Sequence, residues 1–333
     1  YTVWSDVLVC PSCSKELVYW DVAVESKSGT VNDVFQCPHC GSKIEKKDCP
    51  RAQESFFDVY QDKPVFVAKH VPVMISYSVG KKRYQKSPDD YDISVIERIK
   101  QSEIPFWVPS NRMPEGRESR RNDISGITHV HQFYTKRNLI ALAVYWDKAQ
   151  HVVDERIRWY LYYTLTSVFS RSHKLNRYMP NHFRHVGPLS GTLYIPTLQA
   201  EISIFDLLAD KTKSICRVPS PKDGNIISCQ STTDLSNIPS NSVDYIFTDP
   251  PFGDNLNYSE LNFLMESWLK IFTANTKEAV INDVQHKALN EYLQLMSACF
   301  TEYYRVLKPG RWITIEFHNS KNAVWNAIQE ALG

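Results

Sequence analysis

The hydrophobic pattern predicts a chain of alternating strands and helices. Short apolar runs within residues 63–78 are typical of strands. Apolar residues at helical spacing predict helices over residues 136–148 and 154–170, and Thr135 is placed to cap the first of them. The second helix is apolar on more than one face, which indicates a core position.

The last third of the chain shows a more regular alternation. Strands are predicted at residues 225–229, 243–248 and 312–317, and helices at residues 260–271 and 290–306. The strand at 243–248 is rich in β-branched and aromatic residues and is bounded by turn formers, which favours a buried parallel strand. Three alternating β/α units predict a doubly wound parallel sheet.

Composition sets limits on the organisation of the protein. The 333 residues suffice for two or three domains, and changes in pattern divide them into residues 1–50, 51–222 and 223–333. The net charge of +1 excludes a chain-wide basic field, so a nucleic-acid surface must be local. The longest apolar run, residues 159–169, is too short to span a bilayer. Without a signal peptide, we expect a cytoplasmic protein with no membrane partner.

Two C-x-x-C motifs lie 23 residues apart and carry four of the eight cysteines: Cys10, Cys13, Cys37 and Cys40. Between them, strands at residues 17–24 and 31–35 are predicted to form a hairpin that brings the motifs together. Four thiolates can then surround one Zn²⁺ tetrahedrally. The alternative is a redox pair, against which two such motifs on one hairpin argue. A site with four cysteine ligands has no open position, so we expect structural zinc, with Cys49 and His39 as bystanders.

The stretch Asp249-Pro250-Pro251-Phe252 comes directly after the strand predicted at 243–248. Ligands bind at the carboxyl ends of strands in open α/β sheets. Because proline has no N–H, the strand ladder cannot continue, and carbonyl oxygens are left free to accept hydrogen bonds. An acid, a carbonyl and an aromatic ring are what an exocyclic amine requires before its nitrogen attacks a methyl donor. The alternative is a proline-rich turn with no chemical role.

Two clusters of basic residues are candidates for contacts with phosphates. Arg171, Lys174 and Arg177 recur at three-residue spacing, so they share one face if the helix at 154–170 continues. They are our candidates for phosphate contacts, and a solvated helix end is the alternative. A polar, irregular stretch at residues 107–123 adds Arg112, Arg117, Arg120 and Arg121, which either meet phosphates or lie in a solvated loop.

The stretch at 249–252 resembles motif IV, D-P-P-[YF], of S-adenosylmethionine-dependent amino-methyltransferases that act on nucleic acid bases. More widely, the chain resembles the adenine-specific DNA methyltransferases that contain a Zn-ribbon. That resemblance also rests on residues 1–6, on Gly126-Ile-Thr-His-Val-His131, and on residues 187–196 and 307–319. It implies a class I, Rossmann-like methyltransferase sheet with an inserted zinc ribbon and a largely helical middle region.

The resemblance also implies cofactor, partner and mechanism. S-adenosylmethionine would be the methyl donor, and Asp234, just past the strand at 225–229, would lie near its adenine as motif III; a turn or helix-capping aspartate is the alternative. The partner would be DNA, with the target adenine flipped out of the duplex. Phe252 would stack on that base, while Asp249 and the Pro250 carbonyl accept hydrogen bonds from its N6 amino group. Phe252 departs from the commoner tyrosine and lacks its hydroxyl.

The glycine-rich turn [DN]-x-[FY]-x-G-x-G that such enzymes use for the cofactor is not found among the 11 glycines. In the family it lies before the ribbon, so we expect the chain to be part of a longer protein and inactive alone. RNA base amines, notably guanine N2 in tRNA, remain an alternative substrate. N4 of cytosine fits less well because serine commonly replaces the acid there. A non-catalytic DNA-binding remnant is the alternative from another class. The sequence specifies neither a target site nor membership of a restriction-modification system.

Overall fold

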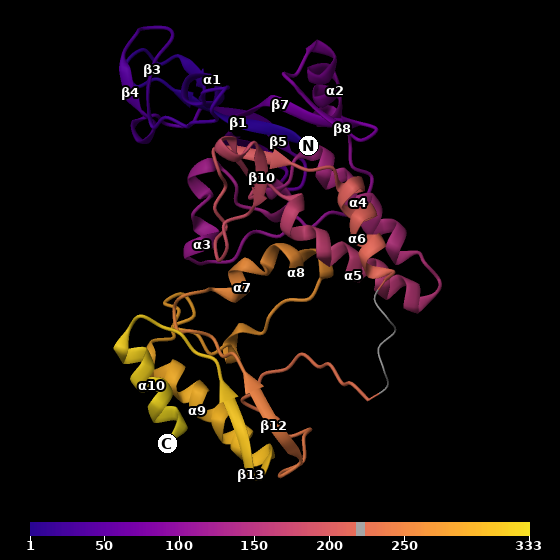
Figure 1. Cartoon of the computed structure of the whole chain (residues 1–333), viewed down its shortest axis with the longest axis vertical. Helices are drawn as coiled ribbons and strands as arrows, with labels where there is room; N and C mark the ends of the chain where they lie inside the picture. Colours follow the sequence, from indigo (N-terminus) through magenta and orange to yellow (C-terminus); the bar gives the residue numbers. More distant parts are fainter. Residues whose placement is uncertain (218–223) are drawn as a thin grey trace. The chain divides into compact units, whose positions relative to one another are not determined.

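The computed structural model describes residues 1–217 and 224–333 (Figure 1). It divides into two compact units. The N-terminal unit comprises Tyr1–Pro219 with Ser267–Leu269, and the C-terminal unit comprises Ser220–Glu266 with Lys270–Gly333. Each unit is considered by itself.

The N-terminal unit contains the strands β1 (Thr2–Val9), β2 (Glu16–Val18), β3 (Val34–Gln36), β4 (Lys43–Glu45), β5 (Gln53–Asp58), β6 (Lys63–Ala68), β7 (His70–Val79), β8 (Lys82–Lys86), β9 (Arg177–Met179), β10 (Arg184–Gly187) and β11 (Leu198–Glu201). Its helices are α1 (Tyr19–Ala23), α2 (Asp90–Gln101), α3 (Arg117–Arg120), α4 (Lys136–Gln150), α5 (Glu155–Ser172) and α6 (Ile204–Ile215). The C-terminal unit contains β12 (Val243–Thr248), β13 (Leu307–Ile315), α7 (Tyr258–Leu261), α9 (Leu289–Val306) and α10 (Asn322–Leu332). Helix α8 (Phe263–Leu269) carries residues of both units.

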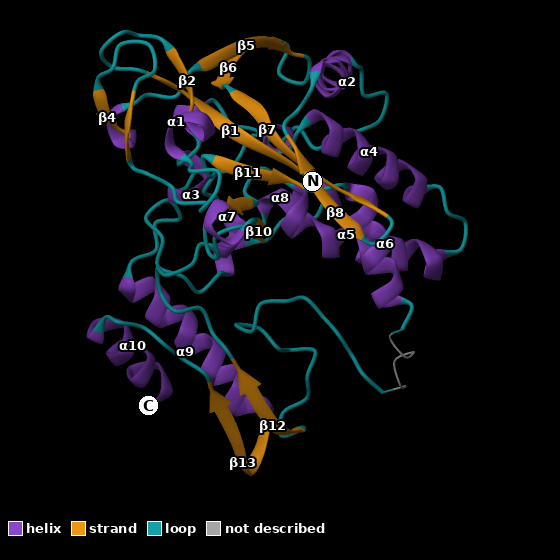
Figure 2. Cartoon of the chain, turned by 45° about the horizontal axis from the view of Figure 1, so that its top comes forward, coloured by secondary structure: helices purple, strands orange, loops and turns teal. Residues whose placement is uncertain are grey.

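One sheet organises the N-terminal unit, and Figure 2 shows its strands in orange. The strand order is β10-β9-β11-β1-β7-β8, with β2 paired to β1, and every one of these pairings is antiparallel. The central strand β1 is buried from Thr2 to Leu8. Its Val3 belongs to a core that includes Met74 from β7 and Ala200 from β11. The sheet is therefore built around β1.

The predicted doubly wound parallel fold is wrong. The largest sheet is antiparallel, and it is formed by residues predicted as the ribbon and as a largely helical middle region. Among the described strands, only β12 and β13 pair in parallel, as a separate two-stranded sheet. The physical reason is that β1 pairs with β7 and β11, which are far from it in the chain. Local periodicity identifies a strand, but it does not specify which distant strand supplies its hydrogen bonds.

The main helices of the middle region form where the apolar spacing predicts them. Thr135 caps α4 by accepting a hydrogen bond from the Asn138 N–H, and Asp154 caps α5 through the Ile157 N–H at 2.9 Å. Helix α5 buries Leu165, Val168 and Phe169, but Ile157, Trp159 and Tyr163 are exposed, so the predicted core helix is only partly buried. Among the described residues, no helix is both long and apolar enough to cross a membrane.

A buried carboxylate joins the β5–β6 hairpin to the 3-10 turn at Val130–Phe133. Asp58, only 3% exposed, accepts hydrogen bonds from His131 Nε2 at 2.9 Å and from the side chain of Gln61 at 2.8 Å. The Tyr60 N–H and the Gln132 amide also donate to it. Burial by itself would raise the pKa of Asp58, but His131 and the other donors hold that pKa well below its usual range.

The C-terminal unit has a smaller core. Strands β12 and β13 pair in parallel, with Ile246 opposite Ile313. Helices α9 and α10 pack together around residues that include Tyr292, Met296 and Val324, and Ile315 of β13 packs against this cluster. One face of the two-stranded sheet is thereby covered.

The strand predicted at residues 225–229 is absent. These residues form no regular element, and Ile226 and Ile227 are 94% and 97% exposed. A strand requires a neighbour for its backbone hydrogen bonds, and the two-stranded sheet contains only β12 and β13. The helix predicted at 290–306 is confirmed as α9, whereas the one predicted at 260–271 is divided into α7 and α8.

The low pKa of Asp58 predicts that the free energy of unfolding decreases at acid pH. Because its pKa in the folded state lies below the ordinary value of 3.8, its contribution is present above about pH 4 and is lost as the pH falls further. Asp58→Asn should lower the free energy of unfolding at neutral pH by about 3–5 kcal/mol. The difference from wild type should shrink on acidification. Denaturant unfolding across the pH range measures this, with the exposed Asp62→Asn as control. A difference independent of pH would contradict the assignment.

Candidate functional site

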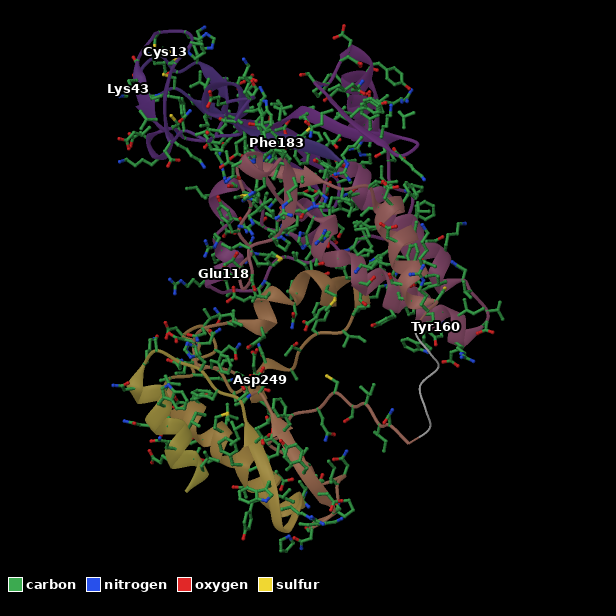
Figure 3. The ribbon with its side chains drawn as sticks, in the orientation of Figure 1. Cys13, Lys43, Glu118, Tyr160, Phe183 and Asp249 are labelled. Carbon is green, nitrogen blue, oxygen red and sulfur yellow. The ribbon has the colours of Figure 1, made fainter. Side chains whose placement is uncertain are left out.

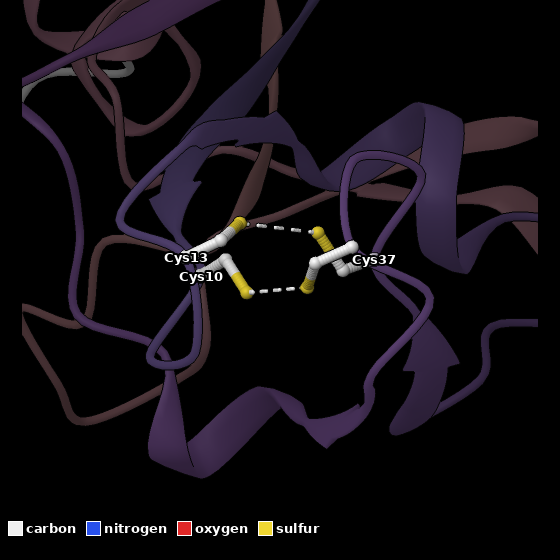
Figure 4. Close-up of side chains that lie close together, drawn as sticks. Cys10, Cys13 and Cys37 are labelled. Carbon is white, nitrogen blue, oxygen red and sulfur yellow. Dashed lines mark hydrogen bonds between the residues drawn. The ribbon is translucent and has the colours of Figure 1, made fainter.

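The four predicted cysteines lie together in the N-terminal unit. Their Sγ atoms all lie within 4.8 Å of one another, with Cys10 and Cys40 separated by 3.9 Å and Cys13 and Cys37 by 3.7 Å (Figure 4). A tetrahedral site with Zn–S bonds of about 2.3 Å requires sulfur atoms about 3.8 Å apart. The cluster is therefore consistent with a structural zinc site.

The two C-x-x-C motifs have the same backbone geometry. The Cys10 N–H donates to the Lys15 carbonyl, and the Cys37 N–H donates to the Ser42 carbonyl, both at 2.9 Å. In each motif the residue after the second cysteine returns a hydrogen bond to the first cysteine's carbonyl. That residue has positive φ in both motifs, 59° at Ser14 and 74° at Gly41. The second motif has the glycine that this conformation favours, whereas the first has a strained serine.

Hydrogen-bond donors favour the thiolate at two of the four cysteines, Cys40 and Cys10. At Cys40 the side chain and then the backbone N–H of Ser42 lower the pKa of the thiol to about 6. At Cys10 burial opposes ionisation, but the backbone N–H groups of Cys13 and Ser12 lower the pKa of the thiol. At Cys13 the Lys15 N–H acts in the same direction, but burial and the neighbouring sulfur atoms raise the pKa of the thiol to about 12. Thiolates are the form in which cysteine binds zinc. Cys49 and His39 are outside the cluster, as the sequence predicted.

The hairpin between the motifs differs from the prediction. The strand expected at residues 17–24 is the short β2 followed by helix α1, and the returning strand expected at 31–35 begins at Val34 as β3. An isolated bridge joins Val24 to Val31. Tyr19 and Ala23 of α1 are buried in the core that also contains Cys10 and Cys37, which explains why this apolar run is helical rather than extended.

In the C-terminal unit, the Asp249–Phe252 stretch leaves the carboxyl end of β12 as a turn that is held from two sides (Figure 3). The Tyr292 hydroxyl, on α9, donates to the Pro251 carbonyl at 2.7 Å. The Asn319 side chain donates to the Phe252 carbonyl at 2.8 Å. Both donors are buried, so these bonds are shielded from water.

The next residue completes this anchoring. The Gly253 carbonyl accepts a hydrogen bond from the Ile281 N–H at 3.1 Å. Gly253 is buried with φ of 72°, and an added Cβ would lie 3.3 Å from Val324. The positive φ favours glycine here, and a side chain would require Val324 to move by a few tenths of an ångström. The turn cannot shift without breaking these contacts.

Two acceptors at the start of the turn remain without such partners. Within the described residues, neither the Asp249 carboxylate nor the Pro250 carbonyl accepts a hydrogen bond. Asp249 is exposed, and its charge acts on Tyr258, whose pKa is raised by burial first and then by Asp249. The Phe252 ring is half-buried and packs edge to face on Phe317, with ring centroids 5.4 Å apart.

Asp234 lies in a turn rather than directly after a strand. Its carboxylate accepts a hydrogen bond from the Ser236 N–H at 3.1 Å, and this bond is the main reason that the pKa of Asp234 is lowered. The neighbouring Leu235 N–H donates to Glu302 of α9 at 2.7 Å. The structure thus shows Asp234 stabilising its own turn.

The three predicted phosphate contacts do not share a helical face. Helix α5 ends at Ser172, so Lys174 follows the helix and Arg177 begins β9. The Arg177 Nε donates to the Gly187 carbonyl at 3.1 Å. Burial lowers the pKa of Lys174 to about 8. Arg171, in contrast, is exposed.

Sequence analysis missed several residues that position these sites. Ser14 could have been found, because it follows Cys13 as Gly41 follows Cys40. Asn319 entered the sequence analysis only as the last residue of the stretch 307–319. Tyr292 gives no local signal, because its contact with Pro251 joins residues 41 positions apart.

Comparisons with protein-family models, with curated proteins and with solved structures found no match to this chain. The four-cysteine cluster is consequently the part of the predicted resemblance that the structure supports.

The cluster predicts a metal content that can be measured directly. The purified protein should contain about one equivalent of zinc. Serine in place of Cys10, Cys13, Cys37 or Cys40 should lower that content, whereas Cys49→Ser should preserve it. Elemental analysis by mass spectrometry measures both. A folded protein free of metal would refute the assignment.

The equivalent turns of the two C-x-x-C motifs predict that substitutions at Ser14 and Gly41 change the stability in opposite directions. Ser14→Gly should raise the free energy of unfolding by about 1 kcal/mol, because it removes the strain of a left-handed serine. Gly41→Ser should lower it by about the same amount. No atom lies within 4 Å of a Cβ built at Gly41, so conformation alone decides the effect. Denaturant unfolding in saturating zinc measures both, and changes of the same sign would contradict the argument.

Proposed function

We propose that the Asp249–Phe252 turn is the amine-binding site of an amino-methyltransferase that acts on nucleic acid, with N6 of adenine in DNA as the acceptor. The observation that supports it is the distribution of hydrogen bonds along the turn. The Pro251 and Phe252 carbonyls are occupied by Tyr292 and Asn319. The Asp249 carboxylate and the Pro250 carbonyl are the acceptors left for a substrate.

An exocyclic amine has two hydrogens, and this turn offers two acceptors for them. Hydrogen bonds from N6 to Asp249 and to the Pro250 carbonyl would direct the nitrogen lone pair away from the turn. Such positioning of a nucleophile by fixed acceptors is catalysis by orientation and electrostatics. No covalent bond to the protein is required, and the proton lost from nitrogen after methylation has Asp249 within reach.

Phe252 supplies the apolar surface for the base. Its ring is fixed by Phe317, which in turn packs edge to face on Trp325 with centroids 5.0 Å apart. A flipped adenine requires an aromatic or apolar side chain in place of the base stack that it leaves. The ring of Phe252 lies three residues from Asp249, so stacking and amine binding are provided by one short segment.

S-adenosylmethionine, when bound, would supply an electrophilic methyl group to the amine. The described residues do not fit a site for it. Asp234 is hydrogen-bonded within its own turn, and no glycine-rich turn follows either β12 or β13. The role proposed for this chain is therefore to hold the acceptor amine, without a part in binding S-adenosylmethionine.

We also propose that the four-cysteine cluster binds a structural Zn²⁺. Its four thiolate ligands come from the two equivalent turns that join β1 to β2 and β3 to β4, so metal binding would fix those strands relative to one another. Together with the turn, this site favours the adenine-specific DNA methyltransferases with a Zn-ribbon as the family. Guanine N2 in RNA offers an amine of the same form and is the second outcome that the test must distinguish.

Asp249→Ala in the full-length protein should lower turnover about 100- to 1000-fold, as loss of one fixed polar group commonly does. DNA binding should persist, because phosphate contacts dominate affinity. Phe252→Tyr should retain activity, since both rings offer the same stacking face. Methyl transfer to duplex DNA and to tRNA is measured by mass spectrometry of the nucleosides.

Asp254→Ala is the matched control, because Asp254 is an exposed carboxylate in the same loop, paired with Lys321 at 2.6 Å. It should keep near wild-type turnover. Wild-type turnover in Asp249→Ala would show that the stretch is a structural turn. Methylation of guanine in RNA would keep the amine site and replace the substrate.

A further inference from the structure

A two-stranded ribbon projects from the sheet of the N-terminal unit. Strands β7 and β8 pair from Ile75 and Lys86 to the turn at Gly80. Every residue from 77 to 85 is exposed, so both faces of the ribbon meet solvent (Figure 1). A β-ribbon of this kind is narrow enough to enter the major groove of DNA.

The tip of the ribbon is basic. Lys81 lies in the turn, Lys82 pairs with Val79, and Arg83 pairs with Ser78. Within the described part of the chain, none of these three cations forms an ion pair. Lys86, at the base of the ribbon, is different, because Asp89 and Asp92 neutralise it at 2.7 and 2.6 Å.

The ribbon is stiffened by aromatic side chains. Tyr77 and Tyr84 lie opposite each other and stack with ring centroids 5.6 Å apart and 24° between the ring planes. Such cross-strand aromatic pairs stabilise a two-stranded ribbon. Both rings are 42% exposed, and their outer surfaces are available to bases.

Two of the four arginines at residues 107–123, in contrast, are held in ion pairs: Arg120 with Asp123, and Arg121 with Glu118.

We infer that the ribbon of residues 77–85 holds the phosphate backbone of a nucleic acid. Unpaired cations beside aromatic faces match a polyanion that also carries planar bases. The inference rests on the proposed function only in taking the substrate to be a nucleic acid. It places substrate affinity in the N-terminal unit, on residues that take no part in the amine site.

The test compares two triple variants with equal loss of charge. One carries Lys81→Gln, Lys82→Gln and Arg83→Gln. The other carries Lys148→Gln, Lys211→Gln and Lys213→Gln, which remove exposed lysines near the ends of α4 and α6. Binding of a fluorescent DNA duplex is measured by anisotropy over a range of salt concentrations, and thermal unfolding confirms that both variants fold.

The ribbon variant should lose about tenfold or more in affinity at low salt, and the slope of log K against log salt should fall by about 0.9 per lost contact. The control variant should bind as wild type. Equal binding by both variants, or wild-type protein that binds anionic lipid vesicles in preference to DNA, would overturn the inference. Methyl transfer by the full-length protein is scored separately, so ribbon-dependent binding without methylation would refute only the proposed function.

Discussion

Backbone pairing of β1 is the constraint on which the N-terminal unit depends. A strand buried from Thr2 to Leu8 must have its N–H and carbonyl groups satisfied by protein, because water does not reach them. The adjacent strand β2 and two strands from distant parts of the chain, β7 and β11, provide those partners. The first zinc-site cysteine, Cys10, follows β1 directly, and the basic ribbon is the continuation of its neighbour β7. Both surface features thus take their orientation from one buried strand.

The prediction succeeded where the chemistry is local. The two C-x-x-C motifs act over a few residues each, and the same is true of the cap Thr135. It failed for the sheet, because residues 1–9 carry no signal that their partners begin at His70 and Leu198. Strand pairing is decided by burial summed over the whole unit, whereas periodicity describes only one strand at a time.

In the candidate amine site, likewise, some features follow from the local sequence and others depend on distant residues. Two prolines in succession predict that carbonyls leave the strand ladder, and that much follows from the sequence. Which carbonyls stay free depends on Tyr292 and Asn319, which lie 41 and 67 residues away from the carbonyls they bind. Sequence analysis could therefore name the acceptors Asp249 and Pro250. It could not show that the two acceptors after them are already occupied.

The two faces of the β12–β13 pair differ, and the difference bears on the site. Tyr245, Phe247 and Trp312 are 55%, 63% and 78% exposed on one face, whereas the other packs on α9 and α10. Parallel strands are normally covered on both faces. The stability of this pair therefore depends on helices α9 and α10 and on hydrogen bonds at the ends of the strands. At the carboxyl end of β12, the Thr248 carbonyl accepts a hydrogen bond from the Glu316 N–H at 2.9 Å. The Thr248 hydroxyl also forms a hydrogen bond with the Tyr303 hydroxyl. The strand is thus anchored directly before Asp249, which is the positioning that the proposed amine site requires.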